Sequence, residues 1–573
     1  MNQLMIRTVL VCSLMAAVIF GLSLHKIEPL PVSGAPLQFD AQQSYTYMSQ
    51  LAAGFPNRVT WGESRHKAEN WVKEEFHKLG YEPQTLRFSE MIAGKEYTDL
   101  ENVYAEKRGT RYPDQIIVMM AHYDIVDTTE QGAMDDASGV GIVLELARIF
   151  AHEQTNRTMI FLITDSEEYG AFWGARSFAH YFDRANQIIA APSFDFVAPE
   201  KQTRIITLCD GLKTGYTPLW LRELALNSIT GVKAVDMSGP LEFIERAMQI
   251  PASDHGAMLA AGIPSFNWVG QTDNFTYEMA HYHHTPYDRV EALRPESFDA
   301  YGKSAERLVR SIDALYKVPS DYRNSSYWKI SRRFYIDGWA ALLLHILAFI
   351  PFLAYSGWKC SSILKKRPHK RVWEICKNEA KSLGIVAGAL LLGYAVILTL
   401  PALRVITQYE TFPATQKSAL LYNPDFTAML AVLAAVVAVY WIFKRAFRAP
   451  EDSIGAIEIR HAFHAVLLAG VILLAFLKNS YLAVLLLLPP AYLWTALRAR
   501  RRTGDRVLNG LLLLGGAVTF VTMAIVLSTV FHVGVVYWYM FLAAAYGLIS
   551  VYATVLFLIA FAVMIRLFLA FVA

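Results

Sequence analysis

From about residue 336 to its end, the chain is dominated by long apolar runs. A helix needs about 20 predominantly apolar residues to cross the hydrocarbon core of a bilayer. Seven runs approach that length and are candidate spans: 336–356, 383–403, 427–443, 462–477, 481–497, 508–531 and 538–565. The sequence therefore predicts an all-α membrane domain over 336–573, with about seven transmembrane helices in contact with membrane lipid.

The preceding part of the chain has an ordinary globular mix of residues, so we predict one globular domain over 35–320. This division explains a hydrophobic share of 54%, which is high for a soluble enzyme. Residues 8–23 form an apolar run preceded by Arg7, typical of a cleaved signal peptide or a retained signal anchor. Because no clear small-x-small cleavage motif follows, we expect residues 1–30 to be a signal anchor.

Positive charges gather in every second loop between the apolar runs. They are Lys359, Lys365, Lys366, Arg367, Lys370, Arg371, Lys377 and Lys381, then Lys444, Arg445, Arg448 and Arg460, then Arg498, Arg500, Arg501, Arg502 and Arg506. The intervening loops hold little beyond Lys417 and Lys478. Basic loops face the cytoplasm, so the globular domain is expected on the other side. That side is a bacterial periplasm, with the chain in the inner membrane, or the lumen of a vacuole or endoplasmic reticulum.

Apolar segments and helical patterns alternate through the globular domain. Residues 115–120, 158–163 and 187–191 are typical of buried strands, and 141–150 is typical of an amphipathic helix. This alternation predicts an α/β fold with a mostly parallel mixed sheet and helices on both faces. Of four cysteines only Cys209 lies in this domain, which excludes an internal disulfide. No basic patch interleaved with aromatic residues indicates nucleic acid binding.

Ligand-type side chains follow these predicted strands at their carboxyl ends, where open α/β sheets place their active sites. The residues are His122 and Asp124 after the first strand, Asp135 before the helix, Glu167 and Glu168 after the second strand, Asp195 after the third, and His284 in a later loop. Imidazole and carboxylate groups are the ligands of hydrolytic zinc sites. The set therefore predicts a hydrolytic metal site with two ions.

A two-metal site needs a bridging carboxylate and further ligands on each ion. Asp135 is the candidate bridge, because the small residues after it allow a tight turn under the metals. His122 and Asp195 are expected to complete the coordination of one ion. Glu168 and His284 are expected to complete the coordination of the other ion.

Two further carboxylates are candidates for catalytic roles. Glu167 cannot easily point the same way as its neighbour Glu168, so we predict that it is the general base, which activates the metal-bound water and passes the proton to the leaving amine. Asp124 is expected to accept the other N–H of the His122 imidazole and fix its tautomer.

Each motif alone has an ordinary structural explanation. Glu167 and Glu168 could be the acidic first turn of a helix, and Asp135 with Asp136 could cap one. His122 alone could be a core histidine. The order and spacing of the whole set favour the metal site.

The set His-x-Asp, Asp-Asp-x-Ser-Gly, Glu-Glu-x-Gly, a lone Asp and His-Thr-Pro resembles the M28 family of zinc peptidases over roughly residues 40–315. The segment Ser253-Asp254-His255 also resembles the family. The resemblance implies a zinc exopeptidase-like fold, a peptide substrate, two zinc ions on the ligands named above, Glu167 as base, and a cis peptide bond after Asp135. The anchor and multispan region resemble the membrane-bound branch, which includes vacuolar and endoplasmic-reticulum proteases and bacterial relatives.

One position departs from the family. Secreted aminopeptidases of the family often carry Tyr directly before the last His ligand, where it helps to stabilise the oxyanion. This chain has His283 there and Tyr282 one residue earlier. The oxyanion or substrate partner is therefore His283, Tyr282 or a residue from elsewhere.

The expected function is a membrane-anchored di-zinc metallopeptidase, most directly an aminopeptidase. One alternative is a glutaminyl-cyclase-like transferase that uses a single zinc on the same fold. Another is a non-catalytic receptor or complex subunit, which the complete ligand set disfavours. Transport by the spans is disfavoured because they hold few charges, apart from the polar residues His345 and His464. No feature of the sequence specifies an oligomeric state.

Overall fold

A computed structural model of the chain describes residues 3–92, 95–168, 172–199, 201–249, 251–274, 278, 281–399, 454–497 and 503–530, with isolated positions between 430 and 441 and between 555 and 567. The chain divides into two compact units. One is built on His25–Tyr335, and the other on Met1–Leu24 and the described residues from Ile336 onward.

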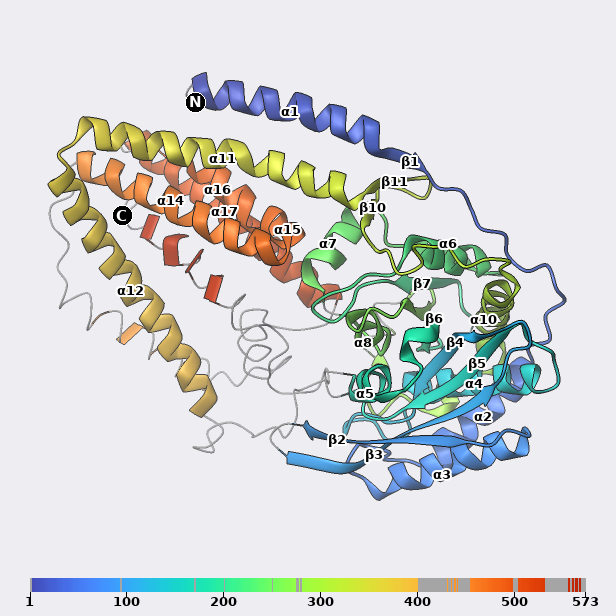
Figure 1. The fold of residues 1–573 in the computed structure, drawn as a ribbon. Helices are drawn as coiled ribbons and strands as arrows, with labels where there is room; N and C mark the ends of the chain where they lie inside the picture. Colours follow the sequence, from blue (N-terminus) through green and yellow to red (C-terminus); the bar gives the residue numbers. More distant parts are fainter. Residues whose placement is uncertain are drawn as a thin grey trace. The chain divides into compact units, whose positions relative to one another are not determined.

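The first unit is organised around an eight-stranded sheet with the order β2-β3-β5-β4-β6-β9-β7-β8 (Figure 1). The strands are β2 (Gln84–Ile92), β3 (Lys95–Lys107), β4 (Tyr112–His122), β5 (Arg157–Thr164), β6 (Ile188–Asp195), β7 (Arg204–Leu208), β8 (Lys233–Asp236) and β9 (Ser265–Gln271). The four central strands run parallel, and β7 is parallel to β8. The pairs β2–β3, β3–β5 and β7–β9 are antiparallel, so the sheet is mixed, as predicted.

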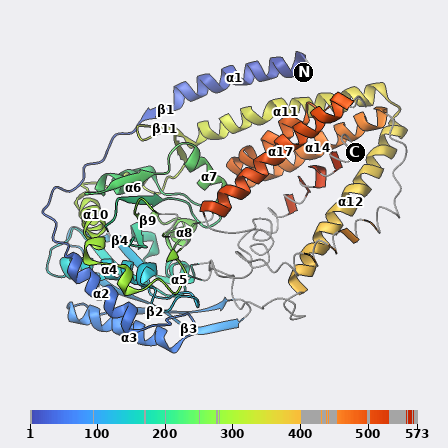
Figure 2. The same ribbon diagram turned by 180° about the vertical axis from the view of Figure 1, so that it is seen from behind.

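Helices cover both faces of this sheet, which confirms the predicted layers (Figure 2). On one side lie α2 (Ala41–Gly54), α4 (Ser138–Ala151) and α10 (Pro295–Ala314), and on the other α5 (Trp173–Tyr181) and α8 (His255–Ala260). Alternate residues of β4 enter the two cores: Ile117 and Met119 pack on the first side, Ile116 and Val118 on the second. A strand buried on both faces is apolar at every position, which is why 116–120 is a continuous apolar run.

The remaining elements of this unit are short or peripheral. They are α3 (Glu63–Lys78), α6 (Leu219–Ser228), α7 (Pro240–Met248), and a separate sheet of β1 (Leu24–Lys26), β11 (Phe334–Asp337) and β10 (Tyr327–Lys329).

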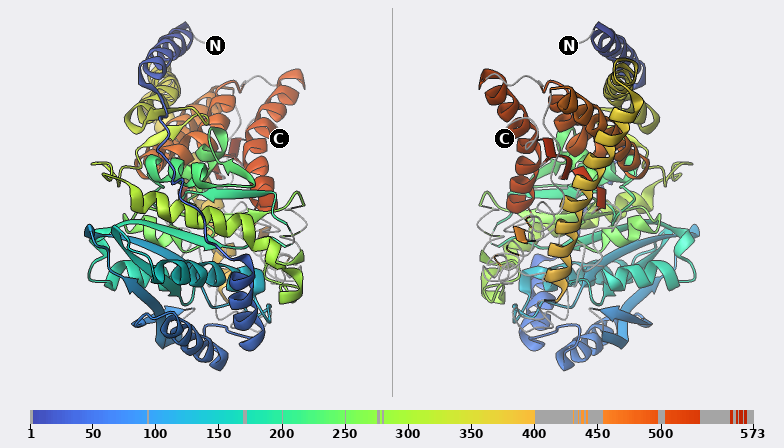
Figure 3. Two further views of the ribbon diagram at one scale, coloured as in Figure 1. Left: turned by 90° about the vertical axis from the view of Figure 1, so that its right-hand side faces the viewer. Right: turned by 90° about the vertical axis from the view of Figure 1, so that its left-hand side faces the viewer.

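The described part of the second unit is mostly helical. Its helices are α1 (Gln3–Ser23), α11 (Gly338–Lys366), α12 (His369–Thr399), α14 (Ile454–Lys478), α15 (Ser480–Leu482), α16 (Leu488–Trp494) and α17 (Thr503–Val530). Helix α1 lies beside α11 (Figures 1 and 3). Among the described residues, three helices are long and apolar enough to cross a membrane: Ile6–Ser23, Gly338–Lys366 and Gly455–Lys478. The candidate spans 427–443 and 538–565 lie largely outside the described residues.

Helix α11 is one of the described helices that are long and apolar enough to cross a membrane. Trp339, the second residue of α11, and Trp358, eight residues before its last residue, are both exposed, at 53% and 37%. Their separation along the sequence corresponds to about 29 Å of helix, close to the thickness of the hydrocarbon core. Tryptophan is enriched at both interfaces of a membrane. Lys365 and Lys366 follow in the last turn of the helix.

Charged side chains also meet inside this unit. The Glu379 carboxylate of α12 accepts hydrogen bonds from Arg566 Nε at 2.9 Å and Arg566 Nη2 at 3.0 Å. Arg460 Nε and His464 Nε2 of α14 lie 3.3 and 3.4 Å from its oxygens. Sequence analysis treated Arg460 as a topology marker and missed Glu379 and Arg566.

Candidate metal centre

Three strand ends bring the predicted ligands to one edge of the sheet. His122 is the last residue of β4 and Asp195 the last of β6, and β4 is parallel to both β5 and β6. His122 pairs with Thr164, the last residue of β5, so Glu167 and Glu168 begin only a few residues beyond it. Parallel strands end at the same edge, which explains why residues far apart in the sequence meet here.

Asp135 lies between two imidazoles. Its Oδ1 is 3.3 Å from His122 Nε2, and its Oδ2 is 3.2 Å from His284 Nε2. The peptide bond between Asp135 and Asp136 is cis, as the family resemblance implied. One carboxylate that offers a separate oxygen to each histidine has the arrangement of a bridging ligand.

The other predicted ligands surround this carboxylate. Glu168 Oε2 lies 2.9 Å from His284 Nε2, while Glu168 Oε1 is buried without a hydrogen-bond partner. Three groups have ligand atoms within 4.8 Å of one another: His122 with Asp135 and Glu168, His122 with Asp136 and Asp195, and Asp135 with His283 and His284. The structure therefore brings all five predicted ligands into one cluster.

Glu167 lies beside the cluster but belongs to none of these three groups. Its Oε2 is 3.9 Å from His122 Nε2. Burial raises the pKa of Glu167 well above its usual value, and the neighbouring His122 opposes that shift. A carboxylate that lies near the predicted ligands without joining them is free to exchange a proton.

Asp124 positions this acidic pair. Its Oδ1 accepts the N–H of Glu167 at 3.0 Å, and its Oδ2 accepts that of Glu168 at 3.3 Å. His122 Nδ1 lies 3.2 Å from the backbone oxygen of Asp124 and 3.5 Å from its carboxylate. His122 Nδ1 thus lies close to both oxygen types of Asp124, and the role of the Asp124 carboxylate in fixing the tautomer stays a prediction.

Two carboxylates that sequence analysis did not assign hold the ligand loops. Asp136 accepts the N–H of His122 at 3.2 Å and of Gly139 at 2.9 Å. Asp288 accepts the N–H of Met134 at 2.7 Å and of Asp135 at 3.1 Å. Their targets are backbone groups, so only their nearness to the motifs signals the role in the sequence.

Arg58 is a third residue that sequence analysis missed. It is fully buried, and its guanidinium donates to the backbone oxygens of Tyr123 at 2.7 Å, Gln131 at 2.6 Å and Gly132 at 3.1 Å. These residues border the segments that carry His122 and Asp135, so one side chain ties both segments together.

The neighbourhood of Tyr282 and His283 differs from that of the ligands. The His283 side chain is 26% exposed, and its Nε2 lies 3.4 Å from Asp135 Oδ2. Tyr282 packs against the edge of the hydrophobic core. His283 therefore faces the cluster through its Nε2.

The cluster carries far more acidic than basic groups. The buried carboxylates are Asp124, Asp135, Asp136, Glu167, Glu168, Asp195, Asp254 and Asp288. Burial raises the pKa of Asp195 and of Asp288 to about 7 and of Asp254 to about 6. Buried negative charge is unfavourable unless cations compensate it. Imidazole nitrogens, carboxylate oxygens and one orphaned carboxylate oxygen fit divalent zinc.

The metal-free protein is expected to lose stability as pH rises. The pKa of Asp195 and Asp288 is about 7 in the folded chain, against about 3.9 in an unfolded chain. Below pH about 4 both states hold these protons, and between about 4 and 7 only the folded state keeps them, so stability is lost across that interval. The thermal midpoint of chelator-treated protein should be lower at pH 7.5 than at pH 5. Zinc-loaded protein should show a smaller fall, and an unchanged midpoint in the metal-free protein would contradict this prediction.

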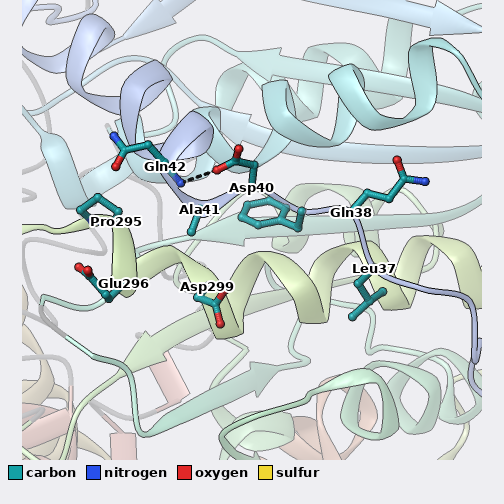
Figure 4. A pocket seen from close by; sticks show the side chains of 9 residues that line it. Leu37, Gln38, Asp40, Ala41, Gln42, Pro295, Glu296 and Asp299 are labelled. Atoms are coloured by element: carbon teal, nitrogen blue, oxygen red, sulfur yellow. Dashed lines mark hydrogen bonds between the residues drawn. The ribbon is translucent and has the colours of Figure 1, made fainter.

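A separate pocket of about 570 Å³ lies on the same unit, between the segment that leads into α2 and the start of α10 (Figure 4). It is lined by residues 37–42 with Pro295, Glu296 and Asp299. Asp40 there caps α2 by accepting the N–H of Gln42 at 2.9 Å. None of the clustered residues lines this pocket, so it is not part of the candidate metal centre.

The part of the chain that carries this centre is similar to known peptidases. Residues 102–309 match the model of a family described as Peptidase family M28. A probable zinc metalloprotease of Leptosphaeria maculans is 40% identical over 268 residues, which cover 40% of this chain and 57% of that protein. Aminopeptidase YwaD of Bacillus subtilis is 25% identical over 231 residues, covering 39% of this chain and 47% of that protein.

A membrane protein is also among the relatives. The vacuolar membrane protease of Candida albicans is 27% identical over 162 residues, covering 28% of this chain and 19% of that protein. The chain spans between about a fifth and just over half of the length of these three curated relatives.

Proposed function

We propose, on the premise that residues 102–309 form a peptidase family M28 domain, that the chain is a membrane-anchored metallopeptidase with two zinc ions, and that it removes amino-terminal residues from peptides. The observation that carries the proposal is the position of Asp135. Its two oxygens face His122 and His284, with Glu167 beside the first of these imidazoles.

The ligand assignment is the one predicted from the sequence, and the distances from His284 to Asp135 and Glu168 support its second set. His122, Asp135 and Asp195 would hold one ion, and Asp135, Glu168 and His284 the other. Zinc supplies a Lewis acid for the scissile carbonyl and lowers the pKa of bound water toward neutrality. Asp136 stays outside both sets because its oxygens already accept backbone N–H groups.

A side chain of the protein, Glu167, would carry the proton from the attacking water to the leaving group. Glu167 takes a proton from the attacking water and later gives it to the leaving amine, so the carboxylate is regenerated in each cycle. Its position is set by the Asp124 carboxylate, which holds the backbone of Glu167 and Glu168. Peptide bond cleavage adds the water's hydroxyl to the carbonyl carbon and its proton to the amine nitrogen.

We further propose that residues 1–30 anchor the chain, that 35–320 form the peptidase domain and that 336–573 span the membrane, with the peptidase domain on the non-cytoplasmic side. The ion cluster of Glu379, Arg460 and Arg566 supports this topology. Each of the three residues borders a different predicted span, at the end that the basic loops assign to the cytoplasm. Ion pairing among these residues requires the three span ends to lie on the same side of the membrane.

Relatives also favour a membrane location. One curated relative is named a vacuolar membrane protease, and three described helices are long and apolar enough to cross a bilayer. A periplasmic or a vacuolar or endoplasmic-reticulum lumen location fits the same orientation.

A glutaminyl-cyclase-like transferase with a single zinc is the second candidate, because it would use the same fold. The two sets of ligand atoms around Asp135 favour the peptidase, since a single ion needs only one set. A non-catalytic receptor or complex subunit is disfavoured by the clustering of all five predicted ligands.

An assay on the purified full-length chain distinguishes these functions. We expect release of amino acids from aminoacyl substrates with a free α-amino group, loss of that activity with a chelator, and recovery with zinc. An N-acetylated copy of each substrate should not be cleaved. Cyclisation of amino-terminal glutamine without hydrolysis of other substrates would establish the transferase, and inactivity of the zinc-loaded chain on all substrates would contradict catalysis.

A further inference from the structure

His283 and His284 direct adjacent imidazole rings to the same carboxylate oxygen. Their ring centroids are 3.7 Å apart, and the ring planes are inclined by only 22°. Asp135 Oδ2 lies 3.4 Å from His283 Nε2 and 3.2 Å from His284 Nε2. Sequence neighbours in an extended chain point to opposite sides, so this arrangement needs a special backbone conformation.

The backbone at His284 supplies that conformation. Its φ is +55°, in the left-handed region that a residue with a side chain rarely adopts. Two hydrogen bonds hold the turn: Thr128 Oγ1 donates to the His284 oxygen at 2.9 Å, and Thr285 Oγ1 donates to the His281 oxygen at 2.6 Å. Such conformations persist where the surroundings enforce them, and they gather at functional sites.

The distances around Asp135 Oδ2 match those between the ligands of one ion. With zinc bonds of about 2.0–2.1 Å, two tetrahedral ligand atoms are separated by about 3.3 Å. The separations are 3.4 Å from Asp135 Oδ2 to His283 Nε2, 3.2 Å from the same oxygen to His284 Nε2, and 2.9 Å from His284 Nε2 to Glu168 Oε2. His283 Nε2 therefore fits as a further donor beside Asp135 and His284, with which it forms one ligand group.

We propose that His283 binds, through Nε2, the ion that Asp135, Glu168 and His284 hold. This inference rests on the proposed function, because it concerns the same zinc centre. Four protein donors close that ion's coordination, as in structural zinc sites, whereas catalytic sites keep a position open. The ion of His122, Asp135 and Asp195 then keeps the open position, next to Glu167, which lies 3.9 Å from His122.

A ring-preserving substitution tests this role. In His283→Phe an aromatic ring that can stack on His284 remains, while both imidazole nitrogens, including the donor Nε2, are lost. His281→Phe is the matched control, because His281 stacks on Tyr287 with centroids 4.6 Å apart and belongs to none of the ligand groups. The full-length protein would be stripped with chelator and titrated with zinc against a competing chromophoric chelator.

We expect wild type and His281→Phe to bind two zinc ions with the same affinities. His283→Phe should bind one ion as before and the other at least about tenfold more weakly, since losing even a second-shell partner costs about 10–100-fold. Cobalt-loaded protein should show a changed visible absorption spectrum in His283→Phe alone.

Wild-type zinc affinities and an unchanged cobalt spectrum in His283→Phe would overturn the inference, even if peptide turnover fell. That result would make His283 a substrate contact and leave the proposed function intact. A wild-type protein without zinc affinity would overturn both together. His283→Ala, which also removes the ring, checks that the result does not depend on phenylalanine, and it should weaken the same ion.

Discussion

Glu167→Gln is expected to lower kcat by about 10²–10⁴-fold while the chain keeps its full zinc content. Glutamine has the same shape as glutamate but cannot accept and return a proton. Glu167 belongs to none of the ligand groups, so its neutralisation leaves the zinc ligands in place. The backbone bond from Glu167 N–H to Asp124 also remains.

The measurement is steady-state turnover of an aminoacyl substrate, with metal analysis of the same preparation. Glu130→Gln is the matched control, because Glu130 is 48% exposed and pairs with Arg289 outside the cluster. This control should keep wild-type turnover. If Glu167→Gln kept its turnover, Glu167 would not be the base.

Asp135→Asn is expected to reduce the metal content below one zinc per chain and to lower kcat/KM by more than about 100-fold, since lost second-shell partners alone cost up to that much. The two carboxylate oxygens face different imidazoles, so a single substitution affects both ions. An amide keeps one oxygen and presents an N–H₂ group where the second oxygen was, which repels a cation.

Asp127→Asn serves as the control for this second substitution. Asp127 is exposed and lies eight residues before Asp135, outside the cluster. Metal analysis after dialysis should give wild-type content for the control. An Asp135→Asn protein that retained two tightly bound ions would show that Asp135 is not the shared ligand.

The central sheet was predictable because burial on both faces leaves an unambiguous apolar pattern. The strands β4, β5 and β6 coincide with the predicted apolar segments to within a few residues. The antiparallel strands β2 and β3 were not predicted. They carry many polar residues, such as Glu90 and Glu101, and their pairing depends on partners distant in the sequence.

The ligand cluster was predictable because metal chemistry restricts which side chains serve. His122, Asp135 and His284 meet as their types and order suggested. Arg58 and Asp288 were not predictable, because they act on backbone groups that every residue offers. A side-chain pattern therefore carries no sign of them.

In the helical unit, the charged residues near span ends were interpreted as topology markers alone. Glu379 and Arg566 lie 187 positions apart, and only the packing of helices brings them together. Glu379 is buried with its arginine partners just before the predicted span 383–403, so the expectation that the spans themselves hold few charges stays a prediction.

Anomalous diffraction at the zinc absorption edge, from crystals of the full-length wild-type chain, tests the central claim most directly. The account predicts two zinc peaks about 3.5–4 Å apart, one on each side of the Asp135 carboxylate. One zinc peak only, or zinc peaks remote from His122 and His284, would contradict it.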